Sequence, residues 1–153
     1  MNKYAYVLSP RMASAPPPAQ SPGFLLWRVS NAWQRAVRTA LEPSGLTHAQ
    51  FVILATLEWL GGEQGAKQHE VATLAGMDPM TTSQVTRVLE ERDLVRRDGH
   101  PEDGRAFNVV LTPKGRKTVA RAAPAVAEAE SRFFAASGRH QRSLVTGLGN
   151  LLA

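Results

Sequence analysis

The chain has 153 residues, a formal net charge of +5 and no cysteine. The lack of cysteine excludes disulfides, thiolate metal sites and thiol redox sensing. No apolar run approaches the roughly 18 residues of a membrane span, and the apolar stretch near Met1 is too short for a signal peptide. We therefore expect a cytoplasmic protein of one domain without a membrane partner, and the positive charge is compatible with a polyanionic partner.

The N-terminal part divides into an arm and a helix. Residues 1–20 are rich in proline and predict a flexible arm. Ser21 and Pro22 suit the cap and first position of a helix. Apolar residues then recur at helical spacing until Pro43 and Gly45 end the pattern.

The second helix begins at a capping box, in which Gln50 follows Thr47 by three residues. This segment is apolar nearly all round, which is typical of a central helix. Gly61 and Gly62 are expected to end it.

Two short helices follow. Gly76 predicts the C-terminal cap of the first, and Asp78 with Pro79 predicts the start of the second. The first helix is expected to turn four apolar residues toward a core: Val71, Ala72, Leu74 and Ala75. The second is expected to bury the stripe Val85, Val88 and Leu89.

The outer side of the second short helix is expected to carry hydroxyls and one arginine: Thr82, Ser83, Thr86 and Arg87. A helix fits the major groove of DNA, and short side chains let its backbone come close to the bases. The candidate DNA-binding residues of this helix are Thr81, Thr82, Ser83, Gln84, Thr86 and Arg87. A merely solvated face would have the same composition, and Thr82 stands where a helix-turn-helix often has an apolar residue.

A β-hairpin is expected after this helix. The stretches LVRR and RAFNVVL are strand-like, and Asp103 with Gly104 is a hairpin turn signal. The hairpin would form a wing beside the helix-turn-helix. Arg105 at its tip is placed to enter a minor groove, whose negative potential favours arginine.

The last two helices are expected to supply apolar faces. Thr112 and Pro113 suit the start of a long helix, which Pro124 is expected to kink. The terminal helix has an apolar stripe: Leu144, Val145, Leu148, Leu151 and Leu152. These faces could pack within one subunit, but a twofold interface between two chains is more economical for helices at both ends of a chain.

The stretches LTHAQFVILATL and VATLAGMDPMTTSQVTRVLEERDLVRRDGHPEDGRAFNVVLTPKG resemble the MarR (multiple antibiotic resistance regulator) family. The most specific match is the wing pattern of Pro101, Asp103, Arg105, Leu111, Thr112 and Gly115. His100 and Gly104 depart from it and leave the wing poorer in charge. The resemblance implies a homodimer on double-stranded DNA, with Arg105 in the minor groove. Arg97 and Asp103 of the hairpin are further candidate DNA-binding residues. The resemblance implies that Asp103 orients a basic neighbour such as Arg97, although Asp103 could serve the turn alone.

Members of this family often bind a small aromatic or anionic effector between the dimerisation helices and the DNA-binding lobe. The candidate ligand-binding residues here are Trp27, Arg28, Trp33, His48, Phe51 and Trp59. Aromatic residues at helical spacing more often belong to a core. The four histidines are scattered and predict no metal site, and no catalytic motif or cofactor motif is present.

The combined expectation is a mainly α protein with a small β-hairpin wing. Residues 46–112 would form a winged helix-turn-helix lobe, and residues 21–45 with 113–153 would form a helical dimerisation lobe. We expect a ligand-responsive repressor, not an enzyme, that binds a pseudo-palindromic operator. The alternatives are a helical small-molecule carrier and a winged-helix protein-interaction module that does not read DNA. The second gains some support because residues 67–111 hold six basic and eight acidic side chains.

Overall fold

The computed structural model describes residues 20–100 and 103–152. The expected arm, except Gln20, lies outside these ranges, and so does Pro101 of the wing motif. The side chains of His100 and of residues 103–106 are also outside the described part. The elements in chain order are α1 (Pro22–Leu41), the 3-10 helix η3 (Glu42–Ser44), α2 (His48–Gly61), β1 (Ala66–Lys67), α3 (Gln68–Ala75), α4 (Pro79–Glu91), β2 (Val95–His100), β3 (Asp103–Leu111), α5 (Pro113–Phe134), the 3-10 helix η4 (Ala135–His140) and α6 (Gln141–Asn150).

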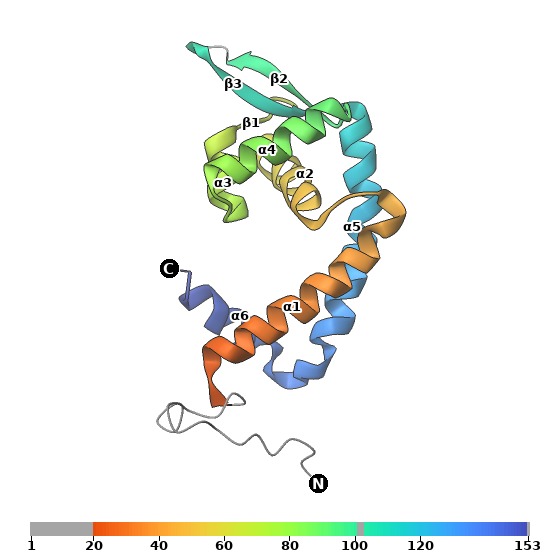
Figure 1. The fold of residues 1–153 in the computed structure, drawn as a ribbon, viewed down its shortest axis with the longest axis vertical. Coiled ribbons are helices and arrows are strands. Elements are labelled where there is room, and N and C mark those ends of the chain that lie inside the picture. The colour runs from red at the N-terminus through yellow and green to blue at the C-terminus, as the bar shows by residue number, and fades with distance from the viewer. Residues whose placement is uncertain (1–19, 101–102, 153) are drawn as a thin grey trace, which may run out of the picture.

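The elements form two lobes (Figure 1). One lobe contains α2, α3, α4 and the sheet, and the other contains α1, most of α5 and α6. The sheet is antiparallel in the order β1-β3-β2. The expected hairpin is confirmed, but the prediction that Asp103 and Gly104 form its turn is wrong, because both lie in β3 and Asp103 pairs with His100 of β2. The two-residue strand β1, which pairs Ala66 with Val109, was not predicted. A strand of two residues is too short to leave an alternating pattern in the sequence.

The predicted helix starts are confirmed by their hydrogen bonds. The Thr47 hydroxyl accepts from the Gln50 amide at 3.2 Å, and the Gln50 side chain accepts from the Thr47 amide at 3.1 Å. Ser21, Asp78 and Thr112 likewise accept from a backbone amide three residues later. Each cap satisfies an amide that the first turn of a helix leaves without a partner.

The core of the first lobe forms around α2. Ile53, Leu54 and Leu57 are buried, but Trp59 at the end of the same helix is 79% exposed. The expectation that α2 is central is therefore correct for its first three turns only. The expectation that Leu74 faces the core is wrong, because Leu74 is 44% exposed. It lies about 110° around the helix from the middle of the face that α3 buries.

The start of α5 is locked to the connection between α4 and β2. The Thr112 amide donates to the Leu94 carbonyl at 3.1 Å, and the Thr112 hydroxyl donates to the Asp93 carbonyl at 2.8 Å. A Cβ atom on Gly115 would lie 1.9 Å from the Leu94 oxygen, so no larger residue fits there without a shift. Thr112 and Gly115 thus fix the helix that joins the two lobes.

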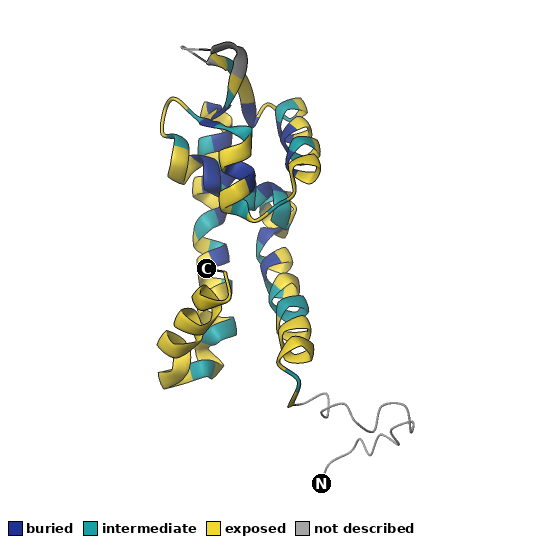
Figure 2. Ribbon diagram, turned by 90° about the vertical axis from the view of Figure 1, so that its left-hand side faces the viewer, coloured by how far each residue is buried: buried dark blue, intermediate teal, exposed yellow. Residues whose placement is uncertain are grey.

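The second lobe contains many exposed residues (Figure 2), and a number of them are large and apolar. In α1 the exposed residues include Phe24, Leu26 and Trp27, and α6 has no buried residue. The predicted stripe of the terminal helix is solvent-facing, with Val145 at 65% and Leu152 at 90% exposure. Its last two residues, Leu151 and Leu152, lie in a turn after the end of α6. Among the described residues, no helix combines the length and the apolar character needed to cross a bilayer. The α5 helix continues through Pro124.

Candidate nucleic-acid interface

The α3–turn–α4 unit is built by a left-handed glycine and a capping aspartate. Gly76 has φ of 63°, which suits a residue without a side chain at the end of α3. Met77 then donates its amide to the Ala72 carbonyl at 3.0 Å. Hydrogen bonds from Thr81 lower the pKa of Asp78, which keeps the cap of α4 ionised. The unit therefore has a helix-turn-helix connection with a fixed start for α4.

The buried face of α4 differs from the predicted one. Thr82 and Thr86 are 0% and 1% exposed, so the prediction that they lie on the outer side is wrong. They share one face with Leu89, following the spacing of seven residues per two turns. The Thr82 hydroxyl donates to the Asp78 carbonyl at 2.9 Å, which leaves its methyl group for packing. Val88, which was expected in the core, is 38% exposed.

The outward face of α4 is therefore narrower and less rich in hydroxyls than predicted. Its exposed residues are Pro79, Met80, Thr81, Gln84, Arg87, Val88 and Glu91. Ser83 is half-buried at the edge. Met80, at 72% exposure, was not among the predicted residues. The signal that could have found it is its spacing of four and seven residues from Gln84 and Arg87.

Arg87 extends into solvent. Its Nε lies 3.8 Å from Glu91 Oε1. The Arg87 side chain is 71% exposed and the Glu91 side chain is 67% exposed. A pair with this exposure contributes little stability and exchanges readily for another partner. The arginine is available for an anion or a base edge at the surface of α4.

The wing follows α4 directly. In β2 and β3, Val95 pairs with Leu111 and Arg97 with Val109, and the register shifts between Gly99 and His100. Arg97 Nη1 lies 3.4 Å from Glu90 Oε2 of α4. The predicted link between Arg97 and Asp103, and the predicted role of Arg105, fall on side chains outside the described part and stay predictions.

The six candidate ligand residues do not form one site. Trp33 and His48 meet edge to face with ring centroids 4.9 Å apart, and Phe51 packs against the same core. Trp27 and Trp59 are 67% and 79% exposed at the far ends of their helices, and Arg28 is also exposed.

The contact between Trp33 and His48 joins α1 to the start of α2. Trp33 Nε1 is buried and has no acceptor among the described residues. Burial lowers the pKa of His48, an effect that nearby Glu130 opposes and Arg38 reinforces. The imidazole is therefore neutral at neutral pH and offers one donor and one acceptor.

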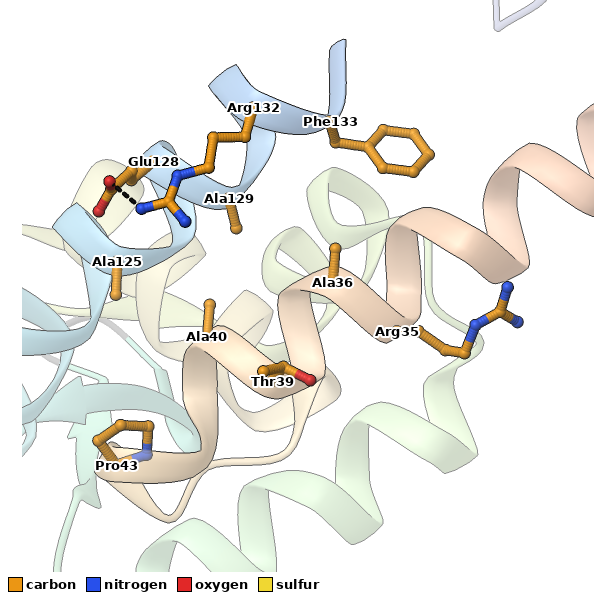
Figure 3. A pocket seen from close by; sticks show the side chains of 10 residues that line it. All are labelled: Arg35, Ala36, Thr39, Ala40, Pro43, Ala125, Glu128, Ala129, Arg132 and Phe133. Carbon is orange, nitrogen blue, oxygen red and sulfur yellow. Dashed lines mark hydrogen bonds and ion pairs between the residues drawn. The ribbon is translucent and has the colours of Figure 1, made fainter. Parts of the chain in front are cut away.

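A groove of about 720 Å³ opens between α1 and α5 (Figure 3). None of the residues that line it was predicted to bind a ligand. Alanines from both helices form its walls, and Phe133 closes one end. Arg132 lies over the groove and pairs with Glu128, one turn earlier in α5. No cluster of three or more His, Asp or Glu side chains suited to a metal ion occurs within residues 20–100 and 103–152.

Comparison with known proteins identifies the family. The MarR family profile matches residues 46–107. The uncharacterized HTH-type transcriptional regulator YdcH of Bacillus subtilis is 36% identical over 136 residues, which cover 88% of this chain and 92% of YdcH.

Several solved structures of transcriptional regulators have a fold similar to that of this chain. CouR of Rhodococcus jostii, bound to p-coumaroyl-CoA, matches with a TM-score of 0.77 and 31% identity over 89% of this chain and 92% of CouR. CouR bound to a 23-mer DNA duplex matches with a TM-score of 0.79 and 31% identity, covering 88% of this chain and 94% of CouR. The Mycobacterium tuberculosis protein Rv2887 in complex with salicylic acid matches with a TM-score of 0.65 and 31% identity, over 87% and 96% of the two chains. The chain is 36% identical to YdcH along most of its length, matches the MarR profile and has a winged fold. It therefore belongs to the MarR family of winged-helix transcriptional regulators.

Proposed function

We propose that the protein is a sequence-specific repressor that binds a pseudo-palindromic operator as a homodimer and responds to a small aromatic ligand. The observation that carries the proposal is the outward face of α4, on which Gln84 and Arg87 lie exposed one turn apart beside the wing. Gln and Arg are the side chains that pair with adenine and guanine edges in the major groove. A regulator with this role works where the chromosomal DNA lies, and we place it in the cytoplasm on that ground.

The exposure of each α4 residue indicates which contact it would make with DNA. Gln84, Arg87 and Met80 point outward and would contact bases or thymine methyl groups. Thr81 would contact a phosphate near the start of α4, where the helix dipole also favours an anion. Thr82 and Thr86, being buried, would act only by holding α4 in place. Arg105 stays the candidate for the minor groove.

The dimer is proposed from apolar surface. The exposed apolar side chains of α1, α6 and the turn after α6 form a set too large for an isolated soluble subunit: Phe24, Leu25, Leu26, Trp27, Val29, Leu144, Val145, Leu148, Leu151 and Leu152. A helix with no buried residue, such as α6, gains little stability until its apolar face is covered. A second copy would cover both helices through a twofold interface and set two α4 helices about one turn of DNA apart.

The ligand is proposed to bind at Trp33 and His48. A buried indole N–H without an acceptor is costly, and a carboxylate or carbonyl oxygen of a ligand would satisfy it. The location supports regulation, because Trp33 belongs to the dimerisation helices and His48 begins the central helix of the DNA-binding lobe. Salicylic acid in Rv2887 and p-coumaroyl-CoA in CouR supply an aromatic ring and a carbonyl group of this kind.

Replacing Arg87 by alanine is expected to weaken binding to a duplex recovered by the wild-type protein from a randomised pool. If Arg87 reads a base, the loss should be about 1–3 kcal/mol, and preference at one base position should relax. Fluorescence anisotropy gives the affinity, and Arg121→Ala in α5 is the control that removes an equal charge elsewhere. Equal losses in both variants would show that α4 does not read the duplex. A wild-type protein that recovers no duplex would favour the protein-interaction module instead.

Replacing Leu148 by glutamate is expected to shift the dimer toward monomers. The carboxylate would sit without a partner in an apolar interface, so the dimer dissociation constant should rise at least about tenfold. Sedimentation equilibrium measures this constant. Thr146→Glu, on the opposite side of α6, introduces the same charge and should leave the dimer intact. Dimers of unchanged stability in Leu148→Glu would place the interface elsewhere.

Replacing Trp33 by phenylalanine is expected to reduce the effect of salicylate on duplex binding. Loss of one hydrogen bond should weaken the salicylate effect about fivefold, since such a bond contributes about 1 kcal/mol. Competition of salicylate with a labelled duplex is the measurement. Trp59→Phe, at an exposed position, should respond to salicylate as the wild type does. A salicylate response equal in the two variants would remove Trp33 from the site.

A further inference from the structure

We propose that Arg97 is a positioning residue that fixes the wing against α4, and that it does not itself bind DNA. It would act through two contacts, an ion pair with Glu90 in the last turn of α4 and a cation–π contact with Phe107 in β3. The consequence for DNA recognition rests on the function proposed above, whereas the contact between wing and helix can be tested without DNA.

The strand register places Arg97 on the inner face of the wing. Arg97 pairs with Val109, and two residues earlier Val95 pairs with Leu111. Directly paired residues of antiparallel strands share a face, and so do residues two apart along a strand. Val95, Val109 and Leu111 all belong to the buried core. Arg97 therefore continues the core-facing side of the hairpin at the point where the core ends.

The two contacts hold the guanidinium between the helix and the outer part of the hairpin. Arg97 Nη1 lies 3.4 Å from Glu90 Oε2, and its Cζ lies 4.9 Å from the centroid of the Phe107 ring. This distance is within the range of a cation–π interaction. A cation close to the last turn of a helix is also favoured by the helix dipole. One side chain thus contacts α4 and joins both strands of the wing.

Burial distinguishes this pair from its neighbours. The side chains of Arg97 and Glu90 are 34% and 36% exposed, compared with 71% and 67% for Arg87 and Glu91. In the described part of the chain, it is the ion pair that links α4 to the wing. An arginine side chain that is paired and about two-thirds covered is poorly placed to neutralise a phosphate. It is well placed to set the angle between the helix that enters the major groove and the hairpin beside it.

Arg96 provides a matched control. It is the adjacent residue in the same strand, but it pairs with Asp98 of that strand at 2.7 Å and lies on the opposite face of the sheet. Arg96→Met and Asp98→Asn change the net charge of the protein by the same amounts as Arg97→Met and Glu90→Gln do. They leave the connection between α4 and the wing in place. Any difference between the two sets of variants therefore reports position and not charge.

The first measurement is hydrogen–deuterium exchange of the free protein. Glu90→Gln and Arg97→Met should each speed exchange of the amides of residues 95–99 and 107–111 by about two- to fivefold, the range that an ion pair of this kind supplies. The double variant should exchange no faster than Arg97→Met alone, because Arg97→Met already removes the ion pair that Glu90→Gln breaks. Arg96→Met and Asp98→Asn should exchange like the wild type.

The second measurement is hydroxyl-radical cleavage of the duplex recovered from the randomised pool. In Glu90→Gln and Arg97→Met, protection of the minor groove at the wing positions should be lost while protection at the α4 positions persists. Both control variants should keep the wing protection. This pattern reports where the wing lies and would not follow from a uniform loss of stability.

The outcomes separate the two proposals. Wild-type exchange in Glu90→Gln, or equal changes in the Asp98→Asn control, would overturn the role of Arg97. A phosphate contact by Arg97 would appear as wild-type exchange in Glu90→Gln, together with a salt dependence of binding about one ion smaller in Arg97→Met. If the wild-type protein protects no duplex, the proposed repressor function fails while the exchange result still decides whether Arg97 fixes the wing.

Discussion

The packing of α4 against the core is the constraint on which the DNA-binding surface depends. Thr82, Thr86 and Leu89 are buried on one side of the helix, and this side determines which residues face outward. A rotation of α4 by one residue position would bury Ser83 and Arg87 and expose a different set. The identity of the reading residues is therefore decided by methyl groups on the inner face of α4.

The lobe that contains α4 is tied to the rest of the molecule at two junctions, of which the first is the start of α5. Thr112 and Gly115 lock the start of α5 to the connection that follows α4, so the helix that leads to the second lobe begins next to α4. Trp33 and His48 lie at the other junction between the lobes. A ligand that favours one spacing of the lobes would alter DNA binding only through its difference in affinity for the two spacings. Each junction is separated from α4 by one element only, because α2 packs against α4 and the start of α5 is bonded to the connection that follows α4.

Local signals in the sequence predicted the secondary structure well, because they act within a few residues. Ser21, Thr47, Asp78 and Thr112 are caps whose partners lie three residues away. The hairpin was marked by its β-branched residues, although Asp103 and Gly104, which were predicted to form the turn, lie in β3. The strand β1 escaped prediction because its partner lies more than 40 residues away. The family was identified from the wing motif and the stretches around it. That motif includes Thr112 and Gly115, whose roles become visible only in the packing against Leu94.

The candidate site was predicted less well, for a reason specific to threonine. Thr82 and Thr86 were assigned to the surface because hydroxyls are polar, but the Thr82 hydroxyl bonds to the helix backbone and its methyl group joins the core. Val88, which is exposed, was assigned to the buried stripe because it is apolar, and exposed Met80 was not assigned to either face. Arg97 was predicted to lie at the DNA, and its partners Glu90 and Phe107 become apparent only when helix and hairpin are placed together.

The orientation of α4 can be measured directly because the chain contains no cysteine. Single cysteines introduced by Gln84→Cys and Thr86→Cys would be labelled with a maleimide, with and without a duplex recovered from a randomised pool. The account predicts fast labelling of Gln84→Cys that the duplex suppresses, and slow labelling of Thr86→Cys whether or not the duplex is present. Fast labelling of Thr86→Cys that the duplex suppresses, with Gln84→Cys unaffected by DNA, would contradict it.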